Sequence, residues 1–213
     1  MTKVKKYTKD SIEKFAMEIL RQQYPRKYKN IYKSDRPDLM TPLNIGVEVT
    51  TDAPKEEREL VNFIGETSQS FPKRLITKLT QMNIQLIKDD ILGVVGYKYN
   101  FFHRNNIANI INIIDKKSNK LMKYQQCYET NLFIMQTKAI DILEQNQLIT
   151  SLKKINSKDR KFKNYYLYGF ADRTLQIIDT KKYNTKTIKI KQKLVEIAYQ
   201  RAYGSDNPSI LCL

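Results

Sequence analysis

The sequence is poor in the residues that build zinc sites and disulfide frameworks. Its 213 residues include two cysteines, Cys127 and Cys212, and one histidine, His103. The cysteines form no CxxC pair, and a Cys/His zinc site needs more ligands of these two types than the chain contains. The sequence therefore argues against a zinc-binding or disulfide-stabilised protein, and it favours a reducing environment such as the cytoplasm.

Long apolar runs are also missing. The N-terminal segment MTKVKKYTKD is polar and charged, without the apolar region of a signal peptide. No stretch approaches the roughly 20 apolar residues that a membrane-spanning helix requires. We therefore expect a cytoplasmic protein that has no membrane partner.

Positive charge dominates the composition. Lysine and arginine number 38 against 22 aspartates and glutamates, which gives a formal net charge of +16. A field of this size attracts polyanions, and nucleic acid is the commonest of them. We expect a nucleic-acid partner, with DNA favoured over RNA, and we leave open whether the chain forms a homodimer. The candidate nucleic-acid-binding residues lie in one basic segment: Lys153, Lys154, Lys158, Arg160, Lys161 and Lys163.

Aromatic residues are interleaved with the basic runs at 153–154, 158–163 and 181–182, at Phe162, Tyr165, Tyr166 and Tyr183. In proteins that bind single strands, such side chains stack on the bases. The group at 165–168 equally fits a strand that carries aromatic side chains on both of its faces. The sequence alone supports both interpretations.

The hydrophobic periodicity predicts one mixed α/β domain covering residues 1–213. Apolar residues spaced three and four apart predict a first helix that is capped by Asp10 or Ser11 and ends at Pro25. Alternating or continuous apolar segments predict strands, including a hairpin between residues 31 and 51. Further helices are expected over 55–64, 71–88, 106–126, 139–155 and 188–203, and strands over 44–51, 91–97, 131–137, 165–170 and 174–180.

The hairpin segment RPDLMTPLNIGVEVT, residues 36–50, contains two acids. Asp38 follows a proline, and Glu48 lies ten positions later within an apolar strand. A hairpin brings such positions to within one strand spacing, about 5 Å. The two carboxylates and the Val49 carbonyl can then share one hard divalent cation, Mg²⁺ or Mn²⁺. Taken singly, each acid also fits a plain role, because Asp often stabilises a turn and a strand Glu often faces water.

RPDL and GVEVT resemble the motif of the PD-(D/E)XK nuclease superfamily. The amphipathic helix before the hairpin, and the helix and strand after it, are similar to the αβββαβ core of that superfamily. The resemblance implies a restriction-endonuclease-like mixed sheet flanked by helices, with the core at about 10–137 and a basic α/β extension at about 138–213. It also implies a nuclease that hydrolyses phosphodiester bonds, with Asp38 and Glu48 as metal ligands and Glu13 as a further acid on the first helix.

The chain departs from this motif at Thr50, where the superfamily has a lysine two residues after the glutamate. A hydroxyl cannot carry the positive charge that orients the attacking water. Members of the superfamily are known to move this lysine to a neighbouring helix, and Lys117 lies on the apolar stripe of the helix at 106–126. We therefore predict Lys117 as the replacement. Alternatively, its stem covers apolar surface while the amine reaches water, and the protein is an inactive nucleic-acid-binding module of the same fold.

Overall fold

The computed structural model describes residues 8–53, 73–81, 84–89, 93–99, 107–124, 126–156 and 161–203. Its centre is a seven-stranded sheet with the order β1-β2-β3-β6-β7-β8-β9. The strands are β1 (Tyr32–Lys33), β2 (Leu39–Met40), β3 (Ile45–Thr51), β6 (Glu129–Gln136), β7 (Asn164–Gly169), β8 (Thr174–Asp179) and β9 (Asn184–Lys189). Because β7, β8 and β9 add to the sheet that holds β1, β2, β3 and β6, the expected C-terminal extension enlarges the same layer.

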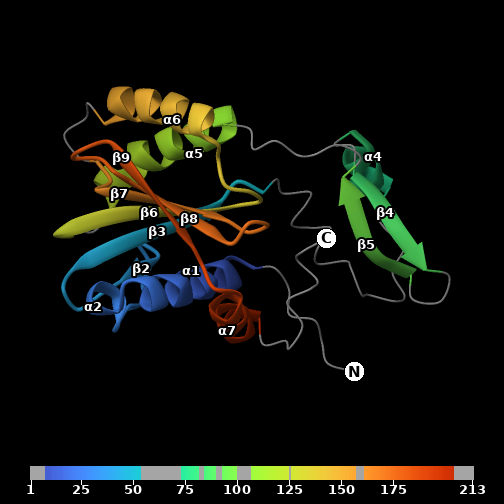
Figure 1. Cartoon of the computed structure of the whole chain (residues 1–213), viewed down its shortest axis with the longest axis horizontal. Coiled ribbons are helices and arrows are strands. Elements are labelled where there is room, and N and C mark those ends of the chain that lie inside the picture. Colours follow the sequence, from blue (N-terminus) through green and yellow to red (C-terminus); the bar gives the residue numbers. More distant parts are fainter. Residues whose placement is uncertain are drawn as a thin grey trace.

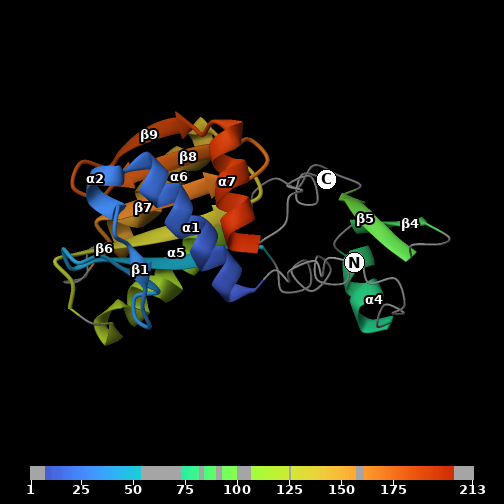
Figure 2. The ribbon, with the colours of Figure 1, turned by 90° about the horizontal axis from the view of Figure 1, so that it is seen from below.

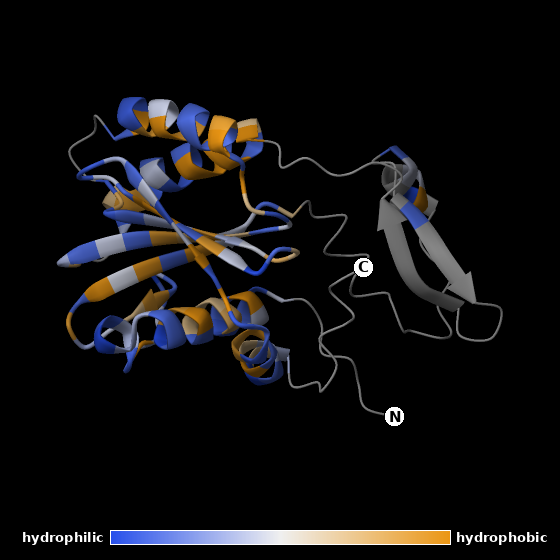
Figure 3. Cartoon of the chain, in the orientation of Figure 1, coloured by the Kyte–Doolittle hydropathy of each residue, from blue (hydrophilic) through white to orange (hydrophobic). Residues whose placement is uncertain are grey.

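Helices cover both faces of this sheet (Figures 1 and 2). One face carries α1 (Lys9–Gln23), α2 (Pro25–Tyr28) and α7 (Gln192–Tyr203), and the other carries α5 (Ile107–Lys120) and α6 (Ile142–Ile155). Apolar and polar positions alternate along these helices (Figure 3), as expected for helices that bury one stripe. The predicted α/β class with a mixed sheet flanked by helices is confirmed.

Strands β3, β6 and β7 are parallel neighbours, and the other neighbouring pairs are antiparallel. The β2–β3 hairpin therefore lies beside β6, and the connection from β3 to β6 passes through α5. Every residue of β6 is buried, which is typical of a central parallel strand covered on both faces. The strand predicted at 131–137 is thus confirmed.

The first helix begins earlier than expected. Thr8, and not Asp10 or Ser11, is the N-cap: the Thr8 hydroxyl accepts the Ser11 N–H at 3.2 Å, and the Ser11 hydroxyl accepts the Thr8 N–H at 2.9 Å. This reciprocal pair is a capping box with serine at its third position. The helix therefore includes Lys9 as its first residue, which matters for the site described below.

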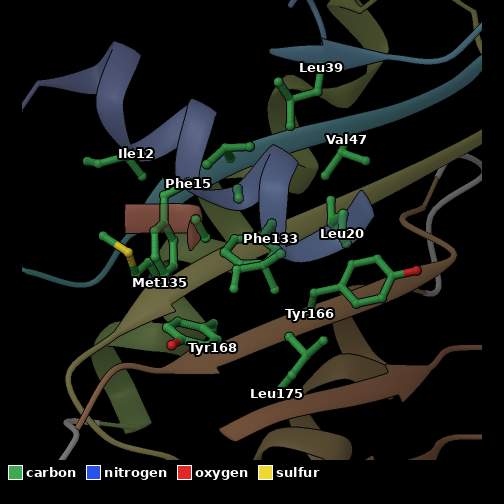
Figure 4. Close-up of a cluster of buried hydrophobic side chains, with 14 of the residues drawn as sticks. Ile12, Phe15, Leu20, Leu39, Val47, Phe133, Met135, Tyr166, Tyr168 and Leu175 are labelled. Carbon is green, nitrogen blue, oxygen red and sulfur yellow. The ribbon is translucent and has the colours of Figure 1, made fainter. Parts of the chain in front are cut away.

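The core forms on both faces of the sheet. On the α1 side, Phe15 contacts Tyr168 edge to face with ring centroids 5.3 Å apart, and Val47 and Phe133 belong to the same cluster (Figure 4). On the α5 side, Ile110 and other buried residues pack on the opposite face of β6 and β7. The predicted inward stripe of the first helix is buried, at Ile12, Phe15, Ala16, Ile19 and Leu20.

The helix predicted over 71–88 is wrong in its second half. Residues Lys73–Gln81 form α4, but Ile84–Asp89 form the strand β4, which pairs with β5 (Gly93–Tyr99) in a separate two-stranded sheet. The apolar residues at 84 and 86 match a period of two as well as a helical stripe, and pairing with β5 selects the strand. The strand predicted at 91–97 exists two residues later, while the helix predicted at 55–64 lies outside the described residues.

Two further boundaries also differ from the sequence prediction. The last helix begins at Gln192 rather than at 188, because residues 184–189 form the edge strand β9. The helix expected to run to 126 ends at Lys120 and continues as a short 3-10 turn, η1 (Leu121–Lys123), which leaves Met122 exposed instead of buried. None of the helices in the described ranges is long and apolar enough to cross a bilayer.

Candidate active site

The β2–β3 hairpin brings Asp38 and Glu48 together. Leu39 pairs with Val47, so the next step of the same register sets Asp38 opposite Glu48. Val47 and Val49 belong to the core on the α1 side, and the alternation of a strand therefore directs Glu48 towards α5. Both acids are almost completely buried, with 2% of Asp38 and 6% of Glu48 exposed.

Lys117 reaches Glu48 from α5. Its Nζ atom lies 2.5 Å from Glu48 Oε1, and its neighbours along the helix stripe, Ile114 and Leu121, are buried as predicted. Lys116 is exposed by contrast. The predicted inward position of Lys117 is therefore correct, and the amine is held by the acid rather than released to water.

A second lysine, which the sequence analysis did not single out, holds the other acid. Lys9 Nζ lies 2.7 Å from Asp38 Oδ1 and 3.3 Å from Glu13 Oε1. The hydrogen bond to Asp38, aided by the charges of both acids and opposed by burial, raises the pKa of Lys9 to about 12. The i, i+4 spacing of Lys9 and Glu13 was the available signal, but it required the helix to begin before Asp10.

Glu13 is brought near the site without entering it. It is buried, and its carboxylate contacts Lys9 and also Lys33 Nζ, the latter at 2.9 Å. Glu13 is not among the residues that line the cavity described below. Its connection to Asp38 therefore passes through the Lys9 ammonium.

The acids open onto a cavity of about 380 Å³. Its lining residues are Lys9, Asp35, Arg36, Asp38, Glu48, Lys117, Lys120, Lys123 and Tyr124. Burial, followed by the charge of Glu48 and a hydrogen bond to its carboxylate, raises the pKa of the Tyr124 hydroxyl. The cavity thus has two buried acids, Asp38 and Glu48, and one exposed acid, Asp35, among five basic residues. This excess of positive charge suits an anionic ligand.

The backbone of Val49 also faces Asp38. Its N–H donates to Asp38 Oδ2 at 2.8 Å, and the carbonyl of a strand residue projects to the same edge as its N–H. The register partner of Val49 on that edge is position 37, where proline has no N–H to donate. The carbonyl predicted as a metal ligand therefore faces the strand edge on which Asp38 lies, although Val49 is not among the residues that line the cavity.

The predicted nucleic-acid-binding segment is only partly described. Lys153, Lys154 and Lys161 are exposed, whereas Lys158 and Arg160 lie outside the described residues. Lys153 Nζ lies 5.6 Å from the centre of the Tyr183 ring. Among the residues of this segment that the structure describes, none lines the cavity at Asp38 and Glu48.

Three of the four interleaved aromatic residues are buried in the core, and Tyr183 is half-buried against it. Phe162 and Tyr165 are buried on the α5 side, and Tyr166 is buried on the α1 side. Their rings are therefore not available to stack on bases. Of the two interpretations that the sequence supported, the strand with aromatic side chains on both faces is correct.

Lys163 is engaged by an acid that the sequence analysis missed. Its Nζ lies 2.7 Å from Glu129 Oε2, and Glu129 also accepts hydrogen bonds from Lys27 and Asn131. Burial would raise the pKa of Glu129, but these hydrogen bonds outweigh it and hold the pKa below its ordinary value. Glu129 is the first residue of β6, and no spacing in the sequence connects it to Lys27 or Lys163.

The site thus consists of Asp38, Glu48 and Lys117 on one cavity, with Lys9 as an additional cation and Glu13 behind it. In the described part of the chain, no cluster of three or more histidine, cysteine, aspartate or glutamate side chains is arranged to hold a metal ion. Any ion bound here would accordingly rest on the two acids, the Val49 carbonyl and ligands from outside the chain. Comparison of the chain with protein-family models, with curated proteins and with solved structures finds no match.

Proposed function

We propose that this protein is a metal-dependent nuclease that hydrolyses phosphodiester bonds, with DNA favoured over RNA. The observation that carries the proposal is the meeting of three groups from separate segments: Asp38, Glu48 and Lys117 line one cavity, and Lys117 Nζ lies 2.5 Å from Glu48. Two buried acids and one amine are the groups that such hydrolysis uses.

The donor set fits Mg²⁺ or Mn²⁺. Mg²⁺ is bound in proteins through one or two carboxylates, and waters and substrate phosphates complete its octahedron. Asp38, Glu48 and the Val49 carbonyl would supply the protein ligands, whereas Asp35, the third acid of the cavity lining, is 95% exposed and lies beside Arg36. A bound ion would supply Lewis-acid polarisation of the scissile phosphate.

The side chains of the protein have separate tasks in this proposal. The Lys117 ammonium, held beside Glu48, is placed to orient a water molecule and to balance the negative charge that develops on the phosphate oxygens. Thr50 shares the strand face of Glu48 but is uncharged, so Lys117 supplies the charge that Thr50 cannot. Burial of both acids strengthens these interactions, because the local dielectric constant is lower than that of water.

The order of elements supports the resemblance to the PD-(D/E)XK superfamily. Along the chain, α1 and the one-turn helix α2 are followed by β1, β2 and β3, and later by α5 and β6. With α2 and the segment containing α4, β4 and β5 set aside, this is the αβββαβ order implied by the resemblance. Asp38 directly precedes β2 and Glu48 lies within β3, which supports the proposal.

Cleavage by the purified full chain tests the proposal. Single-stranded DNA, duplex DNA and RNA are incubated with Mn²⁺ or Mg²⁺, and the fragments are separated on denaturing gels. We expect cleavage that EDTA stops, that Asp38→Asn and Glu48→Gln abolish, and that Lys117→Met slows by about 100-fold.

The matched control is Glu18→Gln. Glu18 is another buried acid, 4% exposed. It pairs with Arg21 on the same helix at 2.8 Å and with Arg201 on α7 at 2.6 Å. Its replacement should leave cleavage unchanged at a temperature where the variant is folded. Intact substrates in all three assays, or cleavage that survives both acid substitutions, would contradict the proposal.

The alternative is an inactive nucleic-acid-binding module. It is favoured by Thr50 at the motif position and by Lys9, whose ammonium is 2.7 Å from Asp38. In that case the lysines serve only to neutralise the acids. It predicts nucleic-acid binding that persists in Asp38→Asn and Glu48→Gln, with no cleavage in Mn²⁺.

A further inference from the structure

The cations around the cavity fall into two groups. Lys9 and Lys117 are committed to the acids, at 2.7 Å from Asp38 and 2.5 Å from Glu48. Lys120 and Lys123 also line the cavity, but their side chains are exposed, and neither forms an ion pair with any residue in the described ranges. The ammonium groups of these two lysines can therefore form ion pairs with an anionic ligand.

Arg36, in the loop before β2, is a further exposed cation of the cavity lining. It is exposed and lies 3.9 Å from the carboxylate of Asp35, which is itself 95% exposed and therefore strongly screened by water. We call Arg36, Lys120 and Lys123 the cationic rim. The rim combines a residue of the loop before β2 with residues at the end of α5 and in η1, and all three line the cavity that contains Asp38 and Glu48.

The depth of the acids restricts the form of a polynucleotide that can reach them. Asp38 and Glu48 are 2% and 6% exposed, so a phosphate must enter the cavity to meet them. A duplex carries its phosphates on the outside of a stiff rod, whereas a single strand can turn one phosphate inward and leave its neighbours on the rim. The half-buried Tyr124 in the same wall adds an aromatic surface of the kind found in single-strand channels.

We propose that the cationic rim binds the backbone phosphates of single-stranded nucleic acid that enters the cavity. This inference rests on the proposed function for its choice of ligand. It replaces the basic segment at 153–163 as the principal nucleic-acid-binding surface, because the described residues of that segment do not line the cavity.

Equilibrium binding in EDTA tests the inference without requiring catalysis. Fluorescence polarisation is measured with a labelled 15-nucleotide DNA single strand, the RNA of the same sequence and the corresponding DNA duplex, over a range of salt concentrations. The variants are Lys120→Gln with Lys123→Gln in the rim, and Lys153→Gln with Lys154→Gln in the rival segment. The control for loss of two positive charges is Lys191→Gln with Lys193→Gln at the beginning of α7. All six lysines are exposed, so the variants are expected to fold.

We expect the wild type to bind a single strand more tightly than the duplex. For single strands, each lost phosphate contact lowers the slope of log binding constant against log salt concentration by about 0.7 in magnitude. The slope of the rim variant, which loses two contacts, should therefore be smaller by about 1.4, while the two other variants should keep nearly the wild-type slope. Duplex binding as tight as single-strand binding, a larger loss in the rival segment than in the rim, or no nucleic-acid binding at all would overturn the inference. Rim-dependent binding without cleavage in Mn²⁺ would overturn only the proposed function, and cleavage with rim-independent binding would overturn only this inference.

Discussion

Replacing Lys117 by methionine isolates the ion pair at the centre of the site. Methionine keeps most of the apolar stem and removes the ammonium that lies 2.5 Å from Glu48 Oε1. The Glu48 carboxylate, 6% exposed, would then remain buried beside Asp38 without its nearest cation. Removing one partner of a buried pair costs about 3 to 5 kcal/mol. Because 24% of the Lys117 side chain is exposed, solvent screens the pair in part, and we expect a loss of about 3 kcal/mol.

Glu48→Gln should be milder. When the Glu48 charge is removed, the Lys117 ammonium can turn towards solvent on its long stem. We therefore expect the free energy of unfolding to fall by about 1 kcal/mol. In the double variant the buried charge and its partner are both gone. The double variant should therefore be more stable than the sum of the single losses predicts, with a coupling energy of about 2 kcal/mol.

Urea denaturation followed by circular dichroism measures the free energy of unfolding of the wild type, Lys117→Met, Glu48→Gln and the double variant. The four values are comparable if the slope of this free energy with urea concentration is the same in all four proteins. Lys116→Met is the matched control, because Lys116 precedes Lys117 on α5 and is exposed. Its replacement should change the free energy of unfolding by less than about 0.5 kcal/mol. A Lys117→Met protein as stable as the wild type, with additive effects in the double variant, would refute the reasoning.

Three further predictions concern the surroundings of the site. A Cβ at Gly46 would lie 2.4 Å from Pro37 Cγ, so Gly46→Ala should displace the segment that carries Asp38. We expect the free energy of unfolding to fall by about 1 to 3 kcal/mol and Mn²⁺ binding to weaken. Titration calorimetry that shows an unchanged Mn²⁺ affinity would contradict this packing. Hydrogen bonds hold the pKa of Glu129 below its ordinary value of 4.5, so the stability that Glu129 contributes is present above pH 4.5 and is lost as pH falls through its pKa in the folded protein. The urea midpoint of the wild type should therefore fall more steeply below pH 4.5 than that of Glu129→Gln. Parallel curves would count against a lowered pKa at Glu129. Lys9→Met should bind Mn²⁺ several-fold more tightly in a titration, because the ammonium and the ion compete for Asp38, whereas weaker binding would show that Lys9 supports the site.

The parts of the fold with strong local patterns were predictable. The apolar stripe of α1 and the continuous apolar run of β6 each have one interpretation, and both are confirmed. Residues 84–89 fit a helical stripe and an alternating strand equally well, so only the partner strand β5 decides between them. Strand β9 carries exposed lysines and threonines along an edge, and no apolar alternation marks it in the sequence.

The candidate site was predictable where a periodic pattern aimed a side chain. Lys117 interrupts an inward stripe, and that position led to its contact with Glu48. Lys9 could not be assigned in the same way, because its role depends on a helix that starts one turn before the first apolar residue. Glu129 and Lys163 meet only through the alignment of β6 with β7, which is a tertiary property.

The central claim is that Asp38 and Glu48 together hold one divalent ion. Isothermal titration of Mn²⁺ into the wild type, Asp38→Asn, Glu48→Gln and the Glu18→Gln control measures this directly. The account predicts one ion per chain in the wild type and in the control, and loss of binding in each of the two site variants. Equal binding in all four proteins would contradict it.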